Sequence, residues 1–207
     1  QKKLRVNKKK FIYLISPNKI KKSFYNELTE ILKLKKVSFF QLRLKNESFK
    51  RKMYIGKKIK KICKNYNTKF LINDDVILAK KLNSDGCHLG QKDMPISEAK
   101  KYLKKKIIGI TCHNSIRLAK LAIKNKADYL AFGAFNISKT KKTKHKANLI
   151  LLKKIKKITK TPIVAIGGIN SSNYKKLLLN KANFLAISGY IWNNKKLKPI
   201  EAIKKIK

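Results

Sequence analysis

Short apolar runs alternate with amphipathic, Lys-rich segments along the whole chain. The eight runs are FIYLIS (11–16), VSFFQLRL (37–44), KFLIN (69–73), GCHLG (86–90), IIGIT (107–111), DYLAFGA (128–134), PIVAIGG (162–168) and FLAIS (184–188). The segments between them have the pattern of one-sided helices and cover about 21–33, 47–66, 75–83, 97–104, 115–126, 147–160, 171–181 and 197–206. Short buried strands separated by single helices are typical of parallel βαβ units.

Eight such units predict a compact (β/α)8 TIM barrel that forms a single domain over residues 1–207, with 1–10 as a basic N-terminal extension. A doubly wound open sheet is the alternative arrangement of the same units. In a barrel, the functional residues lie at the carboxyl ends of the strands. The residues that close each apolar run are therefore the candidates for chemistry.

The strongly basic composition changes this picture less than its size suggests. The chain has 54 Lys and Arg against 10 Asp and Glu, a formal net charge of +44, which at first indicates nucleic acid or an anionic membrane. Only four of these residues are Arg, however, and the Lys are spread over the whole chain. Surfaces that read nucleic acid favour Arg, because its planar fork pairs bidentately with guanine and phosphate. We therefore expect a solvated Lys coat and no specific nucleic acid, with polyanion binding as the alternative.

The three cysteines, Cys63, Cys87 and Cys112, form no metal-binding or disulfide pattern. An odd count without such a framework indicates a reducing compartment, and we expect the cytoplasm. The first apolar run is too short for the hydrophobic part of a signal peptide, and no stretch approaches the ~18 apolar residues of a membrane span. We expect no membrane partner, and the sequence leaves open whether the chain forms a homo-oligomer.

The second apolar run ends in three polar residues at alternate positions, Gln41, Arg43 and Lys45. At a period of two they share one face of a strand, whereas Leu42 and Leu44 face the helices. An amide, a guanidinium and an ammonium on one face are costly to bury without an anion. The pattern predicts an anionic ligand, and a solvated barrel mouth is the alternative.

Four of the five aspartates lie in one short window, at positions 74, 75, 85 and 93. Asp74 and Asp93 follow neighbouring predicted strands, so a parallel sheet brings them to the same rim. Two carboxylates on a basic rim suit Mg²⁺, which takes one or two protein carboxylates together with substrate phosphate oxygens. Taken singly, Asp74 reads as a helix N-cap and Asp93 as a turn residue.

The histidines have different expected roles. His113 follows the fifth run and is a candidate proton shuttle or structural hydrogen-bonding residue. His88 lies within the fourth run and is expected to pack in the core, whereas His145 lies in a Lys-rich loop and is expected to be solvated.

A second group of candidates lies late in the chain. The loop 136–146 interleaves hydroxyl and ammonium side chains, which suits a phosphate oxyanion, although a solvated basic loop is the alternative. Glycines close the seventh run, and Ser188 with Gly189 closes the eighth. Loops after strands 7 and 8 of barrels commonly bind phosphate through backbone N–H groups. Two separate phosphate sites predict a transferase that joins two phosphorylated substrates.

Several motifs together resemble the thiamine phosphate synthase family. They are QLRLK (41–45), INDD (72–75), SDGCHLGQKDMP (84–95), IIGITCHNS (107–115), DYLAFGAFNISKTKK (128–142), PIVAIGGIN (162–170) and FLAISGYIWN (184–193). Their order and spacing fit over about residues 11–206. The resemblance implies a compact barrel enzyme that joins hydroxymethylpyrimidine diphosphate to thiazole phosphate and releases pyrophosphate, with Mg²⁺ as the cofactor.

The resemblance also implies roles for individual residues. For the pyrimidine diphosphate and Mg²⁺ it implies Gln41, Arg43, Lys45, Asn73 and Thr111 as substrate ligands, Lys141 at the departing pyrophosphate, and Asp74 and Asp93 as metal ligands. For the thiazole phosphate it implies Ser138, Thr140, Gly168, Ile187 and Ser188. The catalytic group would be Arg43, Lys45, Thr111 and Lys141.

Three positions depart from the pattern of the family. Leu44 replaces a frequent Glu, Ile137 a usual Pro and Thr143 a frequent acidic residue, and all three departures leave the charged ligands in place. A related barrel family, the thiazole tautomerases, uses a His at the fifth strand, where this chain has His113. Retention of four residues favours the synthase, and the tautomerase is the alternative. They are Gln41, Asn73, Asp74 and Asp93.

Overall fold

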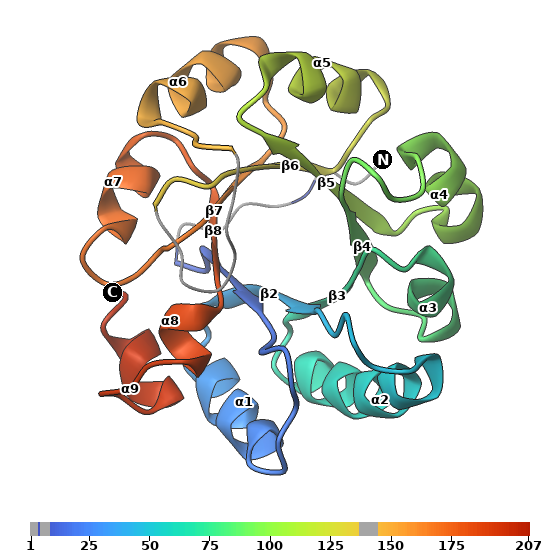
Figure 1. The fold of residues 1–207 in the computed structure, drawn as a ribbon, viewed down its shortest axis with the longest axis vertical. Coiled ribbons are helices and arrows are strands. Elements are labelled where there is room, and N and C mark those ends of the chain that lie inside the picture. The colour runs from blue at the N-terminus through green and yellow to red at the C-terminus, as the bar shows by residue number, and fades with distance from the viewer. Residues whose placement is uncertain (1–3, 5–8, 137–144) are drawn as a thin grey trace.

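Eight parallel strands close into a barrel in which each strand pairs with the next and β8 pairs with β1 (Figure 1). The computed structural model describes residues 4, 9–136 and 145–207. The strands are β1 (Ile12–Ile15), β2 (Val37–Leu42), β3 (Lys69–Asn73), β4 (Gly86–Leu89), β5 (Ile107–His113), β6 (Tyr129–Phe132), β7 (Ile163–Ile166) and β8 (Phe184–Ile187). The predicted (β/α)8 barrel is confirmed, and the open sheet is excluded because β1 and β8 are hydrogen-bonded.

Helices surround the barrel, and one follows each strand. They are α1 (Phe24–Lys33), α2 (Phe49–Asn65), α3 (Val76–Lys81), α4 (Ile96–Leu103), α5 (Ile116–Lys124), α6 (Leu149–Ile158), α7 (Tyr174–Leu179), α8 (Gly189–Trp192) and α9 (Pro199–Lys204). The eight predicted segments each contain a helix, and the short α8 was not predicted. Side-chain caps set several starts: Ser48, Asp75, Ser115 and Asn148 each accept a hydrogen bond from a backbone N–H of the first turn.

The core has two layers because each strand buries both faces. The larger layer packs the outer faces of the strands against the helices, and Leu152 and Ile155 of α6 are fully buried in it. The second layer fills the barrel interior with side chains such as Tyr13, Phe39, Tyr129 and Phe184. No described helix is long and apolar enough to cross a membrane.

Three side chains join neighbouring strands at the amino-terminal end of the barrel. Asp85 accepts a hydrogen bond from Phe70 N (2.9 Å), and Asp128 accepts one from Ile108 N (2.8 Å). The amide oxygen of Asn183 accepts in the same way from Ile163 N (2.8 Å). The three residues immediately precede β4, β6 and β8, and each accepts from a backbone N–H of the preceding strand, β3, β5 or β7. Asp85 is therefore at the opposite end of the barrel from the predicted site.

Candidate active site

Gln41 is the last polar residue of β2 and lies almost fully buried in the barrel. The strand ends at Leu42, so the prediction of one strand face shared with Arg43 and Lys45 is wrong for the latter two. Ser16 explains the break, because its hydroxyl accepts from Arg43 N (2.9 Å) and donates to Arg43 O (3.3 Å). A buried side chain thus replaces the strand ladder and fixes the backbone that carries the guanidinium.

Asp74 follows β3 in the left-handed backbone region, with φ 64°, and its N–H donates to His88 O (2.8 Å). This conformation brings its carboxylate to 3.6 Å from the ammonium of Lys45. Asp74 is not the cap of the next helix, because Asp75 fills that role by accepting from Leu78 N (2.8 Å). The alternative role of Asp74 as a helix N-cap is therefore wrong, and its carboxylate faces Lys45 at the rim.

Asp93 lies on the turn after β4 and accepts a hydrogen bond from Gly90 N (2.6 Å). Partial burial raises the pKa of the Asp93 carboxyl, and the neighbouring Asp74 carboxylate raises it further, whereas the Gly90 N–H and Lys45 lower it. Asp74 and Asp93 follow the neighbouring parallel strands β3 and β4, so they lie on the same rim, as predicted. Crowded carboxylates are stabilised by a cation.

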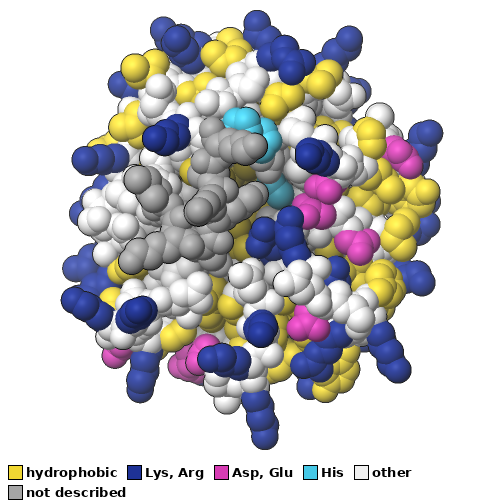
Figure 2. Space-filling view, viewed as in Figure 1, with side chains coloured by type: hydrophobic (Ala, Val, Ile, Leu, Met, Phe, Trp, Pro, Cys, Tyr) yellow, Lys and Arg dark blue, Asp and Glu magenta, His cyan; other side chains and the backbone are white. Residues whose placement is uncertain are grey.

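The two carboxylates of Asp74 and Asp93 fit Mg²⁺ as ligands. Within the described ranges, no group of three or more His, Cys, Asp or Glu side chains could hold a metal ion. Two oxygen ligands from the protein leave room for water and phosphate oxygens, which is how Mg²⁺ is usually bound in enzymes of phosphate chemistry. Figure 2 shows acidic side chains beside His on one side of the barrel mouth, with basic side chains next to them and further Lys and Arg around the outline.

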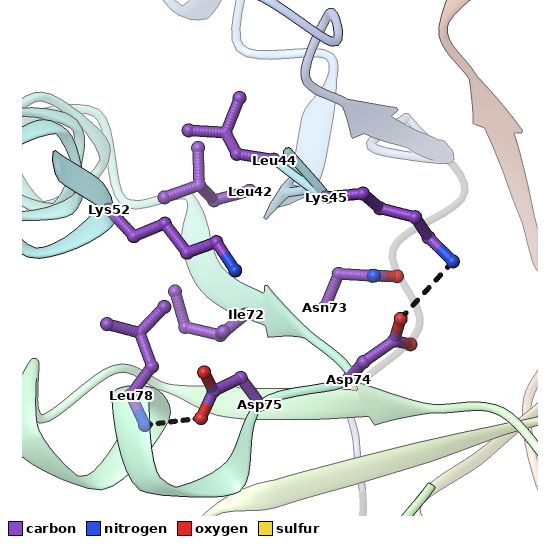
Figure 3. A pocket seen from close by; sticks show the side chains of 9 residues that line it. All are labelled: Leu42, Leu44, Lys45, Lys52, Ile72, Asn73, Asp74, Asp75 and Leu78. Carbon is purple, nitrogen blue, oxygen red and sulfur yellow. Dashed lines mark hydrogen bonds and ion pairs between the residues drawn. The ribbon is translucent and has the colours of Figure 1, made fainter. Parts of the chain in front are cut away.

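A pocket of about 220 Å³ lies beside this pair, between the ends of β2 and β3 and the helices α2 and α3 (Figure 3). Asn73, Asp74 and Lys45 line it together with Lys52, which extends into it from α2. The apolar part is lined by Leu42, Leu44, Ile72 and Leu78. Lys52 was not predicted, because nothing in the sequence distinguishes it from the other Lys of an amphipathic helix.

Thr111 lies on β5, with its hydroxyl 2.9 Å from Nε2 of His88. Burial lowers the pKa of His88 to about 4, against an opposing effect of Asp93, so the ring is neutral near pH 7. His88 is half-buried, and its ring stacks on Tyr129, which agrees with the packing role that the sequence predicted. His113 ends β5 with φ 52°, and its ring stacks on exposed His145 at a centroid distance of 4.1 Å.

The opposite side of the rim is built from backbone. Gly168 follows β7 with φ 54°, and Ser188 follows β8 and donates to Ser16 O (3.2 Å). Ile187 is buried at the end of β8, immediately before the turn into α8. A short helix after strand 8 is a common part of phosphate sites in barrels. The structure therefore places Gly168, Ile187 and Ser188 together at the ends of adjacent strands.

Three predicted ligands, Ser138, Thr140 and Lys141, lie outside the described residues, as do Ile137 and Thr143. The residues just before them are anchored at the end of β7, because Phe135 N donates to Ile166 O and Asn136 N to O of the next residue, Gly167, both at 3.2 Å. Leu44, the third departure from the family pattern, is buried in the outer layer of the core. Its side chain also lines the pocket beside Asp74.

Comparisons with known proteins agree on one family. A family model described as thiamine monophosphate synthase matches residues 12–191. A thiamine-phosphate synthase of Pelagibacter ubique is 70% identical over 200 residues, which cover 96% of this chain and 97% of that protein. One from Erythrobacter litoralis is 36% identical over 92% of each chain.

The solved structures agree at the level of the fold. A thiamine phosphate pyrophosphorylase from Pyrococcus furiosus superposes with a TM-score of 0.85 at 29% identity, covering 96% of this chain and 94% of the other. A 3-hexulose-6-phosphate synthase has a TM-score of 0.67 at 14% identity, which shows only that the barrel is shared.

Proposed function

Because the chain belongs to the thiamine monophosphate synthase family, enzymes of thiamine biosynthesis, we propose that it joins hydroxymethylpyrimidine diphosphate to thiazole phosphate. The products are thiamine monophosphate and pyrophosphate, and Mg²⁺ is the cofactor. The observation that carries the proposal is that Asp74 and Asp93 follow neighbouring strands at one rim of a barrel from this family, with the Lys45 ammonium 3.6 Å from the Asp74 carboxylate.

The pyrimidine diphosphate binds on the side of the rim that carries charged side chains. Gln41, Asn73 and Thr111 hold the pyrimidine and its linkage, and Arg43 and Lys45 contact the diphosphate. Asp74 and Asp93 hold Mg²⁺, which when bound would neutralise the diphosphate oxygens. The thiazole phosphate binds opposite, at Gly168, Ile187 and Ser188, with Ser138 and Thr140 of the loop completing the site.

The reaction asks these residues for positioning and charge neutralisation. The bond between the pyrimidine methylene carbon and the diphosphate oxygen breaks, and its electron pair leaves with the diphosphate. Arg43, Lys45 and Lys141 stabilise that charge. The cation left behind is stabilised by the pyrimidine, and the thiazole nitrogen uses its lone pair to form the new C–N bond. A protein that holds both partners in line needs no covalent nucleophile.

The test is to supply both substrates with Mg²⁺ and to measure the two products. We expect thiamine monophosphate and pyrophosphate in equal amounts. No pyrophosphate release from authentic substrates would overturn the proposal. Interconversion of thiazole isomers without pyrophosphate release would assign the protein to the tautomerases, with His113 as the residue to examine.

A further inference from the structure

A chain of hydrogen bonds crosses the barrel interior from β2 to β5. Gln41 Nε2 lies 2.7 Å from the Tyr13 hydroxyl, which lies 2.7 Å from the Tyr129 hydroxyl. The Tyr129 hydroxyl is 2.9 Å from His88 Nδ1, and His88 Nε2 is 2.9 Å from Thr111 Oγ1. The two ends are residues of the proposed pyrimidine site, whereas the three middle residues have no role in the mechanism above.

With the amide nitrogen of Gln41 facing Tyr13, the number of hydrogens sets the direction of this hydrogen-bond chain. The amide nitrogen of Gln41 can only donate, so the Tyr13 oxygen accepts and its single hydrogen goes to Tyr129. The single hydrogen of Tyr129 then goes to Nδ1 of His88. A neutral imidazole carries one N–H, so His88 donates from Nε2 to Thr111.

The direction determines what the two ends offer to a ligand. Gln41 has its amide nitrogen turned to Tyr13, and its carbonyl oxygen Oε1 is left as an acceptor. Thr111 has accepted a hydrogen bond, and its own hydroxyl hydrogen is left to donate. If the Gln41 amide were reversed, every hydrogen bond in this series would reverse its direction, and the acceptor at Gln41 and the donor at Thr111 would change places. The middle residues therefore couple the hydrogen-bonding properties of the two ends.

Packing keeps the two tyrosines of this hydrogen-bond chain away from water. Tyr13 and Tyr129 are essentially fully buried, and the rings of His88 and Tyr129 stack at a centroid distance of 5.7 Å. Gly109 of β5 makes room for Tyr129, because a Cβ at this position would overlap the tyrosine ring. In the described part of the chain, every buried side-chain nitrogen and oxygen has a hydrogen-bond partner. Breaking one link would therefore leave a buried polar group unpaired.

We propose that Tyr13, Tyr129 and His88 are positioning residues that set an acceptor at Gln41 and a donor at Thr111. The inference rests on the proposed function, in which both ends face the pyrimidine diphosphate. Such a site selects a heterocycle with an amine donor near β2 and an oxygen or nitrogen acceptor near β5. An aminopyrimidine with an ester oxygen fits, whereas the analogue with an oxo group in place of the amine presents an acceptor to an acceptor.

The first test needs no activity and so is independent of the proposed function. In ligand-free, ¹⁵N-His-labelled protein near neutral pH, NMR should show His88 as the neutral Nε2–H tautomer. The signals are assigned with His113→Ala and His145→Ala variants, since these are the other histidines of the chain. A neutral Nδ1–H tautomer or an imidazolium would overturn the proposed direction. Tyr129→Phe should remove the donor to Nδ1 and shift the His88 signals.

The second test is kinetic and has a matched control. Tyr13→Phe and Tyr129→Phe should each lower kcat/KM for the pyrimidine diphosphate about ten- to hundredfold, with KM for the thiazole phosphate unchanged. Discrimination against the oxo analogue should shrink as well. Tyr174→Phe is the control, because Tyr174 is equally buried but its hydroxyl donates to Lys207 O (2.8 Å) in the outer layer. If all three variants lose stability alike and none changes substrate preference, the middle residues are merely structural.

Discussion

The two ends of the barrel use their few carboxylates in different ways. At the amino-terminal end, Asp85 and Asp128 each accept a hydrogen bond from a strand N–H. At the carboxyl-terminal rim, Asp74 and Asp93 lie beside each other, and the pKa of Asp93 is raised. The chain has only 10 acidic residues against 54 basic ones. Asp85 and Asp128 complete hydrogen bonds between strands, whereas Asp74 and Asp93 lie at the same rim.

The difference teaches which property of the side chain matters at each end. Asn183 makes the same strand contact as Asp85 and Asp128 without any charge, so this contact needs an acceptor and not an anion. Asp85 also forms an exposed ion pair with Lys69 (3.0 Å), and such a pair contributes little to stability. At the rim, one carboxylate beside another is unfavourable by itself and becomes favourable around a cation. The rim therefore needs charge, and substitutions at the two ends should separate activity from stability.

The largest effect is expected from removing a rim carboxylate. Asp74→Ala or Asp93→Ala should lower turnover about 100- to 1,000-fold, the range found when one electrostatic contribution to a transition state is removed. The measurement is the initial rate of pyrophosphate release at saturating substrates, together with Tm. Tm should change little for Asp74→Ala, because the Asp74 carboxylate pairs with the exposed Lys45. Asp93→Ala also leaves Gly90 N without its acceptor, so a modest fall in Tm is expected there.

His113→Ala is the comparison for these variants, since His113 lies on the same rim but outside the proposed metal site. It should change turnover much less than either aspartate variant. The reverse order of effects would contradict the synthase mechanism and point to the tautomerase.

The next effect belongs to the amino-terminal end. Asp85→Ala leaves the buried N–H of Phe70 unpaired and should lower the free energy of unfolding by about 1 to 3 kcal/mol, measured by urea denaturation. Turnover of the folded variant should stay at the wild-type value. Asp85→Asn keeps an acceptor, as Asn183 does, and should recover most of the loss. A fall in turnover without a loss of stability would contradict the assignment of Asp85 to stability and not to activity.

A smaller effect tests the backbone-built side of the rim. Gly168→Ala forces a side chain into a backbone with φ 54°, at a cost of about 1 kcal/mol. It should raise KM for the thiazole phosphate severalfold and leave KM for the pyrimidine diphosphate unchanged, as measured by varying each substrate in turn. Gly56→Ala is the control, because Gly56 lies in α2 and the nearest atoms to its Cβ belong to the side chain of Leu82 in the outer layer of the core, away from the thiazole phosphate site.

The smallest effect is on the pH dependence of stability. Burial raises the pKa of Asp128, against opposing effects of the Ile108 N–H and Lys100. The folded protein therefore holds this proton more tightly than the unfolded chain, and stability falls as pH rises from about 4 through the raised pKa. Asp128→Asn should remove that fall while keeping the strand contact. An unchanged slope of Tm against pH would show that Asp128 does not contribute it.

The fold could be predicted because each apolar run forms a buried strand and each amphipathic segment forms a helix with one buried face, so their alternation gives the order of elements in the barrel. Lys69–Asn73 forms the predicted strand. Arg43 and Lys45 lie beyond the end of β2, because the Ser16 hydroxyl, and not a neighbouring strand, accepts the hydrogen bond of Arg43 N. The short helix α8 was missed because four residues are too few to show a helical period.

Much of the site depends on closure of the barrel. The short Asp window does not form one cluster, because Asp75 caps α3 and Asp85 lies at the other end. Tyr13 and Tyr129 look like ordinary members of apolar runs, and only closure brings β1 and β6 within reach of each other. The roles of Asp74 and Asp93 at a metal stay a prediction of the sequence that the geometry fits.

A magnesium titration tests the central claim most directly. Pyrophosphate release from both substrates is measured against Mg²⁺ concentration for the wild type, Asp74→Asn and Asp93→Asn, after treatment with EDTA. We expect release to stop in EDTA, to return with Mg²⁺, and to need at least tenfold more Mg²⁺ for half-maximal rate in either variant. Release that persists in EDTA, or the same Mg²⁺ requirement in all three proteins, would contradict a metal site at this rim.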